Sequence, residues 1–171
     1  YPAGTTIASV VDNVGSSSIR GWEFEGRLRA TSALTINASL SYIDAKFEQF
    51  LAYIPTGPLN TTCPTLVGCI VDVSSARDFQ NTPEWTGSIS ATYNWFLANG
   101  SMLTFLPSIA YRGEYQQFET AAPLLDQGAY WMYDASLVWT SANDRLTLGV
   151  HGKNLGDERY KVGGYSFPGA L

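Results

Sequence analysis

Charge is scarce in this chain of 171 residues. Charged residues make up 15% of it, whereas about 25% is usual for soluble domains. The 10 basic and 15 acidic residues give a net charge of −5 without any basic tract, and binding to nucleic acid is therefore not expected. His151 is the only histidine, and no constellation of catalytic residues accompanies it, so neither an enzymatic site nor a cofactor is expected.

Long apolar runs are absent as well. No stretch approaches the roughly 18 apolar residues of a membrane helix, and no signal-like sequence opens the chain. Residues 1–4 are instead expected to come from the middle of a longer protein. Hydrophobic residues still reach 45% and aromatic residues 13%, which is enough for a folded core. If the protein crosses a membrane, it must therefore cross with strands.

What the chain has instead is alternation. Apolar Trp22 and Phe24 alternate with charged Glu23 and Glu25, and a strand points successive side chains to opposite faces. The same two-residue period, with one apolar and one polar face, predicts about six strands. They cover residues 19–30, 34 to 47 or 50, 85–95, 103–115, 131–140 and 145–153. Pro107 inside the fourth strand predicts an edge or a bulge there.

The connections between these strands alternate in length. Short breaks at residues 31–33, 96–100 and 141–144 alternate with long ones at 51–83 and 116–128. In an antiparallel up-and-down meander every second connection lies at the same edge of the sheet, so all the long loops gather at one end. Short turns at one end and long loops at the other are typical of outer-membrane β-barrels.

The longest connection, residues 51–83, shows no sustained period and contains both cysteines. Cys63 and Cys69 have no histidine nearby and offer too few ligands for a zinc site. We expect them to form a disulfide that closes a small loop in an oxidising compartment. Two free thiols are the alternative.

Aromatic residues flank the expected strands at both ends. Two aromatic belts around an aliphatic middle are expected of a wall that spans a membrane. Trp95, Phe96 and Trp139 lie beside short turns, and Phe47, Tyr111, Tyr115, Tyr130 and Trp131 lie beside long loops. The expected fold is therefore all-β, an antiparallel up-and-down meander that forms a segment of a large transmembrane β-barrel. A soluble β-barrel or sandwich that binds a small ligand is the alternative.

Four short motifs give the chain a resemblance to a known family. Residues 154–160 (NLGDERY) resemble the NL-x-D-x-x-Y motif near the C-terminus of TonB-dependent outer-membrane receptors, and residues 163–169 resemble the loop after it. Residues 13–15 with residues 21–25 resemble the family's N-x-G…G-x-E segment. Residues 81–85 resemble its segment in which a proline precedes a strand. The resemblance covers nearly the whole chain.

The resemblance implies a 22-stranded barrel in the bacterial outer membrane whose lumen is plugged by an N-terminal domain. Such receptors import scarce ligands such as ferric siderophores, cobalamin or oligosaccharides with energy relayed by TonB. The expected partners are outer-membrane lipid, the plug, TonB and the transported ligand. Residues 1–171 would form the C-terminal part of the barrel, without the plug, the TonB box or the last strand. A passive porin-like barrel is a further alternative.

Ligand contacts in a receptor of this kind would come from the outer loops and from the lumen wall just below them. The candidates by position are Arg112, Tyr115, Gln117, Phe118 and Glu119. Arg112 would lie on the wall, and the other four at or above its rim. For each of them an ordinary loop or belt role is the alternative. No metal site is expected.

Overall fold

The computed structural model describes residues 15–54, 68–118 and 122–164. They form seven strands and one short 3-10 helix, η1 (Ser74–Ala76). Among these residues no helix has both the length and the apolar character needed to span a membrane. The strands are β1 (Gly15–Arg29), β2 (Leu34–Ile54), β3 (Cys69–Asp72), β4 (Trp85–Phe96), β5 (Met102–Arg112), β6 (Tyr130–Thr140) and β7 (Thr147–Gly152).

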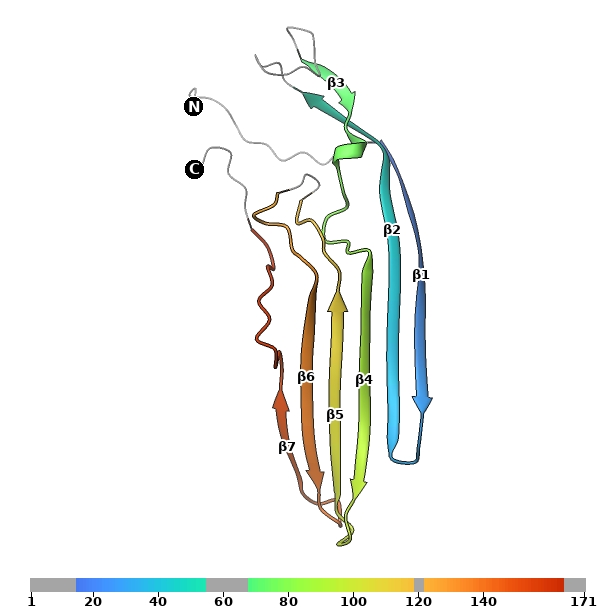
Figure 1. Cartoon of the computed structure of the whole chain (residues 1–171), viewed down its shortest axis with the longest axis vertical. Coiled ribbons are helices and arrows are strands. Elements are labelled where there is room, and N and C mark those ends of the chain that lie inside the picture. Colours follow the sequence, from blue (N-terminus) through green and yellow to red (C-terminus); the bar gives the residue numbers. More distant parts are fainter. Residues whose placement is uncertain (1–14, 55–67, 119–121, 165–171) are drawn as a thin grey trace.

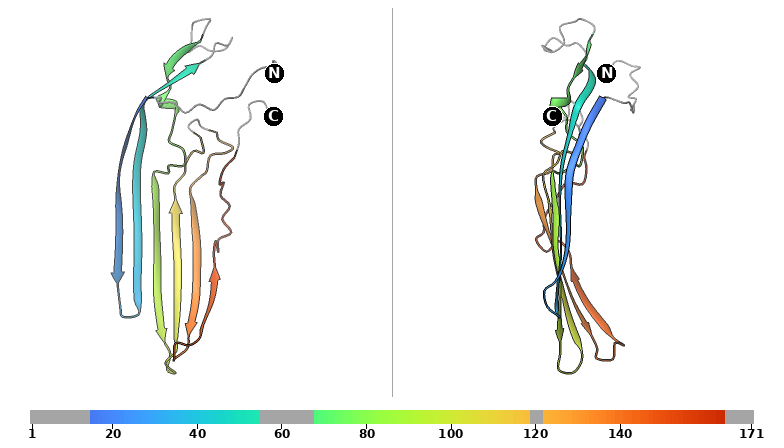
Figure 2. Two further views of the ribbon diagram at one scale, coloured as in Figure 1. Left: turned by 180° about the vertical axis from the view of Figure 1, so that it is seen from behind. Right: turned by 90° about the vertical axis from the view of Figure 1, so that its right-hand side faces the viewer.

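The strands make one antiparallel sheet in the order β1-β2-β4-β5-β6-β7, and β3 pairs with the end of β2. Figures 1 and 2 show this sheet as a single curved layer, with the long connections at its upper end and the short turns at its lower end. The six-stranded up-and-down meander predicted from alternation is therefore confirmed, and β3 is an addition to it.

The register places the apolar side chains of neighbouring strands opposite one another, on what we call the apolar face. Because the side-chain period of a strand is two, one such pair fixes the facing of the whole strand. Directly opposite side chains lie close enough to pack together. The pairs include Phe24 with Leu40, Ile89 with Ile109 and Leu137 with Val150.

No other described element covers the apolar face. Phe24, Ile89 and Val150 are 57%, 58% and 76% exposed. Burying a side chain of this kind stabilises a protein by about 1.5–3 kcal/mol, so a whole face left in water would be costly. The face is suited to contact with lipid, as the sequence predicted.

Aromatic residues gather in two bands on the apolar face. Contacting rings within a band lie between 4.6 and 6.5 Å apart, centroid to centroid. The bands lie about ten residues apart along β4, or about 23 Å for a strand tilted by about 45°, which is close to the apolar band of about 25 Å in membrane barrels. The band at the long-loop end comprises Trp22, Tyr42, Trp85, Tyr111 and Trp131, and the band at the short-turn end comprises Tyr93, Trp95 and Phe105.

Some of the predicted belt residues lie elsewhere. Phe47 stacks on Phe79 of the β3–β4 connection at 4.3 Å, and Tyr130 stacks on Tyr160 at 4.8 Å. Tyr115 follows the end of β5 and is not part of the strand. Phe96 follows Trp95 in the strand, so its side chain points to the opposite face of the sheet. An aromatic residue near a loop in the sequence therefore joins a band only if its side chain also points to the apolar face.

The polar face carries hydroxyl and amide side chains that hydrogen-bond across strands. The Ser39 and Ser88 hydroxyls lie 2.8 Å apart, and the Thr104 hydroxyl donates to Asn94 Oδ1 at 2.8 Å. His151 lies on this face, with its Nδ1 2.9 Å from Ser136 Oγ. These bonds satisfy the side chains within the wall.

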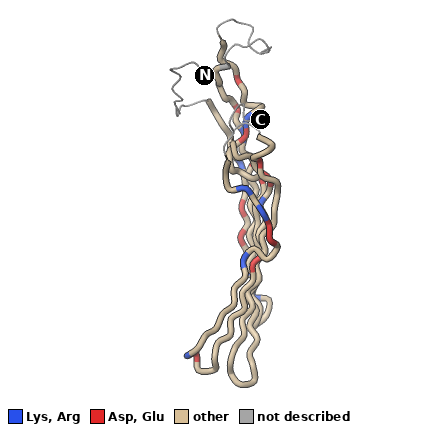
Figure 3. Tube along the Cα trace, turned by 90° about the vertical axis from the view of Figure 1, so that its left-hand side faces the viewer, with Lys and Arg blue, Asp and Glu red and all other residues tan. Residues whose placement is uncertain are grey.

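Charged residues gather toward the long-loop end, and the lower part of the sheet is mostly uncharged apart from its turns (Figure 3). Just beyond the aromatic band at the long-loop end, Arg20 of β1 pairs in register with Asp44 of β2. Lys46 Nζ then lies 2.8 Å from Asp44 Oδ1. The apolar face therefore ends where the charged pairs begin.

The long connection 51–83 contains more structure than the sequence predicted. The last four residues of β2, Leu51 to Ile54, pair with β3, a stretch too short to show a period. Asp72 fastens this extension, because its Oδ1 accepts hydrogen bonds from the N–H groups of Phe50 and Ser74, both at 3.0 Å. These two hydrogen bonds hold the pKa of the Asp72 carboxyl below its usual value, and the bond from Phe50 has the larger effect.

Two local predictions were wrong. Pro107 lies inside the central strand β5, where the β4–β5 ladder omits its position without any shift in register. A proline brings no N–H to a ladder, yet Pro107 still pairs with Ala135 on the other side. The last strand begins at Thr147 and not at Arg145, because the Leu146 carbonyl accepts the Ser141 N–H at 2.9 Å and closes the turn.

Lysine at Leu40 or Ala91 tests the assignment of the faces. Both positions lie on the apolar face near the middle of the strands, and each charge is expected to oppose insertion by about 2–4 kcal/mol. Lysine at Ser39 or Ser90, on the polar face, is the matched control and is expected to be tolerated. The yield of folded full-length protein in the membrane fraction measures the effect. Equal losses at the two kinds of position would show that the faces are wrongly assigned.

Candidate ligand-binding site

A turn after β7 sends the chain across the long-loop end of the sheet. Asn154 and Asp157 have φ values of 49° and 48°, a left-handed backbone that Asn and Asp tolerate better than most residues. Asn154 closes the turn with its amide: Nδ2 donates to the Glu158 carbonyl and Oδ1 accepts the Glu158 N–H, each at 2.9 Å. The Asn154 N–H donates to Asp134 Oδ1 at 2.8 Å and so anchors the turn on β6.

The segment after this turn is fastened to the β5–β6 connection at Lys161. The Lys161 carbonyl accepts hydrogen bonds from the Tyr115 hydroxyl at 3.4 Å and from Gln117 Nε2 at 3.3 Å. Its N–H donates to Gln127 Oε1 at 2.6 Å, and its Nζ donates to the Asp126 carbonyl at 2.7 Å. We call this set of contacts the Lys161 junction. It joins two segments that are far apart in the sequence.

Arg112, the last residue of β5, lies on the polar face below this junction. Its Cζ lies 4.5 Å from the centroid of the Tyr115 ring, a favourable cation–π contact. Its Nη2 donates to the Asn81 carbonyl at 3.3 Å, and its Nε is buried without a partner. No described carboxylate forms an ion pair with it. Arg112 therefore brings an uncompensated positive charge to a hollow of about 460 Å³.

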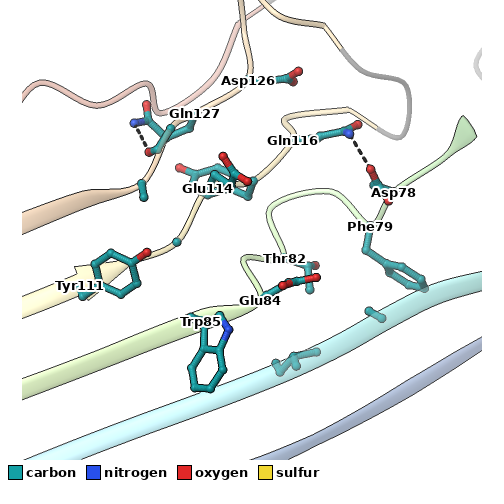
Figure 4. Close-up of a pocket in the computed structure, with 16 residues that line it drawn as sticks. Asp78, Phe79, Thr82, Glu84, Trp85, Tyr111, Glu114, Gln116, Asp126 and Gln127 are labelled. Atoms are coloured by element: carbon teal, nitrogen blue, oxygen red, sulfur yellow. Dashed lines mark hydrogen bonds between the residues drawn. The ribbon is translucent and has the colours of Figure 1, made fainter.

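A larger cavity of about 740 Å³ lies next to this hollow, and we call it the rim cavity (Figure 4). Three segments build its walls: the upper part of β2, residues between 78 and 85, and the two sides of the β5–β6 connection. The Ile43 N–H donates to the Glu84 carbonyl at 2.9 Å and holds the first two segments together. A volume of about 300–1,000 Å³ is usual for small-molecule sites, so the rim cavity can hold a ligand.

Four carboxylates line the rim cavity, and no lysine or arginine among the described residues does. Asp78 accepts a hydrogen bond from Gln116 Nε2 at 2.6 Å, and Asp126 Oδ2 accepts the Ala122 N–H at 3.0 Å. The carboxylates of Glu84 and Glu114 make no hydrogen bond or ion pair with any described residue. The rim cavity is therefore acidic and rich in hydrogen-bond acceptors.

The structure brings three of the five predicted ligand-contact residues together. Arg112 stacks on Tyr115, and Tyr115 and Gln117 share the Lys161 carbonyl. Tyr115 and Gln117 are only 9% and 8% exposed, so they also support the rim. Phe118 is half-buried in the same connection, and Glu119 lies outside the described residues. That these residues bind a ligand stays a prediction.

The four carboxylates were not found from the sequence, since no period relates positions in two separate loops. One signal was present. Glu84 lies just before β4 and Glu114 just after β5, and these strands are joined by a short turn. The Gly113 N–H donates to the Trp85 carbonyl at 2.8 Å and continues the β4–β5 register. The next pair in that register is Glu84 with Glu114.

In the part of the chain that the structure describes, no group of three or more His, Cys, Asp or Glu side chains could hold a metal ion. Cys69 is disulfide-bonded. Cys63 lies outside the described residues, so its pairing with Cys69 stays a prediction.

Replacing Asn154 tests the turn that positions the Lys161 junction. Asn154→Ala removes two hydrogen bonds and disfavours the left-handed backbone, so residues 155–161 are expected to lose about 2 kcal/mol of local stability. Hydrogen exchange of the full-length protein, resolved by peptide, measures this loss. Asn154→Gly keeps the backbone free to adopt a positive φ and isolates the contribution of the side-chain bonds. Unchanged exchange in Asn154→Ala would contradict the role given to the turn.

A family model described as TonB dependent receptor-like, beta-barrel, matches residues 1–155. No curated protein and no solved structure matches the chain. The family match covers every strand of the meander and all the residues that line the rim cavity, and it agrees with the two-faced antiparallel sheet. The chain therefore belongs to the family of TonB-dependent receptor-like β-barrels, the transport receptors of the bacterial outer membrane.

Proposed function

We propose that this chain is part of the wall of an outer-membrane receptor that takes up a scarce ligand with energy relayed by TonB. The ligand classes in question are ferric siderophores, cobalamin and oligosaccharides. The observation that carries the proposal is the division of one curved sheet into a bare apolar face and a hydrogen-bonded polar face. Such a wall separates lipid from a polar lumen.

In this proposal the polar face meets the N-terminal plug of the same receptor, and residues 1–171 are the C-terminal part of its barrel. On β1 the polar face presents Glu23 and Glu25 and, further toward the short turns, Arg27 and Arg29. None of these four forms an ion pair with a described residue. They are therefore free to contact a charged surface in the lumen. TonB would act through the plug.

The long-loop end would then be the outer rim, where a ligand first arrives. Arg112, Tyr115, Gln117, Phe118 and Glu119 are the proposed contacts for the ligand. The guanidinium of Arg112 supports this, because it lies on the polar face without a carboxylate partner. A disulfide between Cys63 and Cys69 would limit the freedom of the outer β2–β3 extension.

Uptake measurements on cells that produce the full-length receptor test the proposal. Radiolabelled ferric citrate, cyanocobalamin and maltotriose serve as probes of the three ligand classes. Receptor-dependent uptake of one probe is expected, and it is expected to stop in cells without TonB. Uptake that persists without TonB would identify a passive porin-like barrel instead. Full-length protein recovered from the aqueous fraction without detergent would identify a soluble binding protein.

A further inference from the structure

We propose that the hollow of about 460 Å³ beside Arg112, which we call the Arg112 hollow, binds a carboxylate group of the transported ligand. The inference deepens the proposed function and rests on it for the statement that a ligand reaches this end of the polar face. It assigns a chemical class to the group that Arg112 receives, namely a single carboxylate attached to a mostly apolar body.

The first reason is a row of donor side chains across the polar face. The register pairs Ser41 with Thr86, Thr86 with Arg112, and Arg112 with Tyr130. Directly paired side chains point to the same face, so the four lie in one row on neighbouring strands that are about 4.8 Å apart. All four line the Arg112 hollow and are buried or half-buried. The wall of the hollow therefore presents one cation flanked by hydroxyl groups that can donate to an anion.

The second reason is that one edge of the Arg112 guanidinium is open. Its Nε is buried without a partner, and a buried donor left unpaired costs free energy. Nη2, on the same edge, donates to the Asn81 carbonyl at 3.3 Å, which is longer than the usual distance of about 2.9–3.0 Å. Two N–H donors along one edge of a guanidinium match the two oxygens of a carboxylate. A bound carboxylate would give both donors a charged acceptor.

The third reason is that the protein supplies no competing anion to the Arg112 hollow. No aspartate or glutamate among the described residues lines it, and no described carboxylate forms an ion pair with Arg112. Four carboxylates do line the neighbouring rim cavity. These would repel a ligand with several negative charges, and the inference is therefore limited to a single carboxylate.

A fixed segment closes the Arg112 hollow at the long-loop end. Asn81 has a left-handed backbone with a φ of 52°. Its N–H donates to the Gln116 carbonyl at 2.9 Å, and its carbonyl accepts the hydrogen bond from Arg112. Pro83, two residues later, is buried. The segment thus joins the start of β4 to the β5–β6 connection, and the hollow is formed before a ligand arrives, as is usual for small-molecule sites.

The rest of the lining determines what the carboxylate is attached to. Ile43, Pro83, Ala110 and Met132 line the Arg112 hollow around the row of donors. An apolar body attached to the carboxylate would be removed from water against these side chains. Inorganic phosphate has no such body and carries more negative charge, so it is the less suitable occupant.

Equilibrium dialysis of radiolabelled benzoate against the detergent-purified full-length receptor tests the inference. Benzoate carries one carboxylate on an apolar ring, and benzamide has nearly the same shape without the charge. Saturable binding of benzoate is expected, and unlabelled benzamide is expected to compete at least about tenfold less well than unlabelled benzoate, because it cannot form the charged pair. Inorganic phosphate is expected to compete less well than benzoate too.

Three variants locate the binding. Arg112→Gln is expected to bind benzoate about tenfold or more weakly. The matched control is Arg20→Gln, which removes the same charge from the same end of the sheet outside the Arg112 hollow, and it is expected to bind as the wild type does. Thr86→Val removes one hydroxyl of the row with little change of shape, and binding about threefold to tenfold weaker is expected.

Four results would overturn the inference: no saturable binding of benzoate, equal weakening in Arg112→Gln and Arg20→Gln, unchanged binding in Thr86→Val, or tighter binding of benzamide or phosphate than of benzoate. If Arg112→Gln does not fold, Thr86→Val decides. Binding in detergent does not depend on TonB, so its failure is distinct from failure of the proposed function. A receptor with TonB-dependent uptake but without benzoate binding would keep the proposed function and lose the carboxylate site.

Discussion

The facing of each strand is the constraint on which the rest of this structure depends. Within a strand no side chain can change face without shifting the register of its neighbours. The strands pair in the order β1-β2-β4-β5-β6-β7, so the Phe24–Leu40 pair at one edge and the Leu137–Val150 pair at the other belong to a single apolar surface. The polar face follows from the same pairing, and its hydroxyl groups satisfy one another. The aromatic bands then mark where the apolar surface ends.

The wall also positions the rim. Because β4 begins beside the end of β5, Glu84 just before β4 and Glu114 just after β5 lie at the same end of the sheet. The β5–β6 connection is held over this place by the Lys161 junction, and the junction depends on the turn at Asn154. Arg112, on the last position of β5, lies below. Arg112 on the wall and the acidic residues at the rim above it are thus positioned by the ends of the strands, without a separate binding domain.

Much of the fold could be predicted from the sequence, because a two-residue period is visible wherever a strand is long enough. Trp85 to Trp95 shows it over nearly the whole of β4. The end of β2 could not be predicted, since Leu51 to Ile54 is too short to show a period and is ordered by pairing with β3. Pro107 misled because a central strand can omit two ladder positions, here those of Leu106 and Pro107, and keep its register. The carboxylates of the rim cavity were missed, because their proximity arises from two loops meeting in space.

The Lys161 junction has a consequence for how substitutions are tolerated. Three of its four hydrogen bonds use the backbone N–H or carbonyl of Lys161, and only one uses its side chain. Tyr115, Gln117 and Gln127 contribute side-chain atoms and are buried. The chemical identity of residue 161 is therefore weakly constrained, whereas the three residues that grip its backbone are strongly constrained. Substitutions of Tyr115, Gln117 or Gln127 should therefore disturb the junction. A substitution of Lys161 should cost little beyond its one side-chain hydrogen bond.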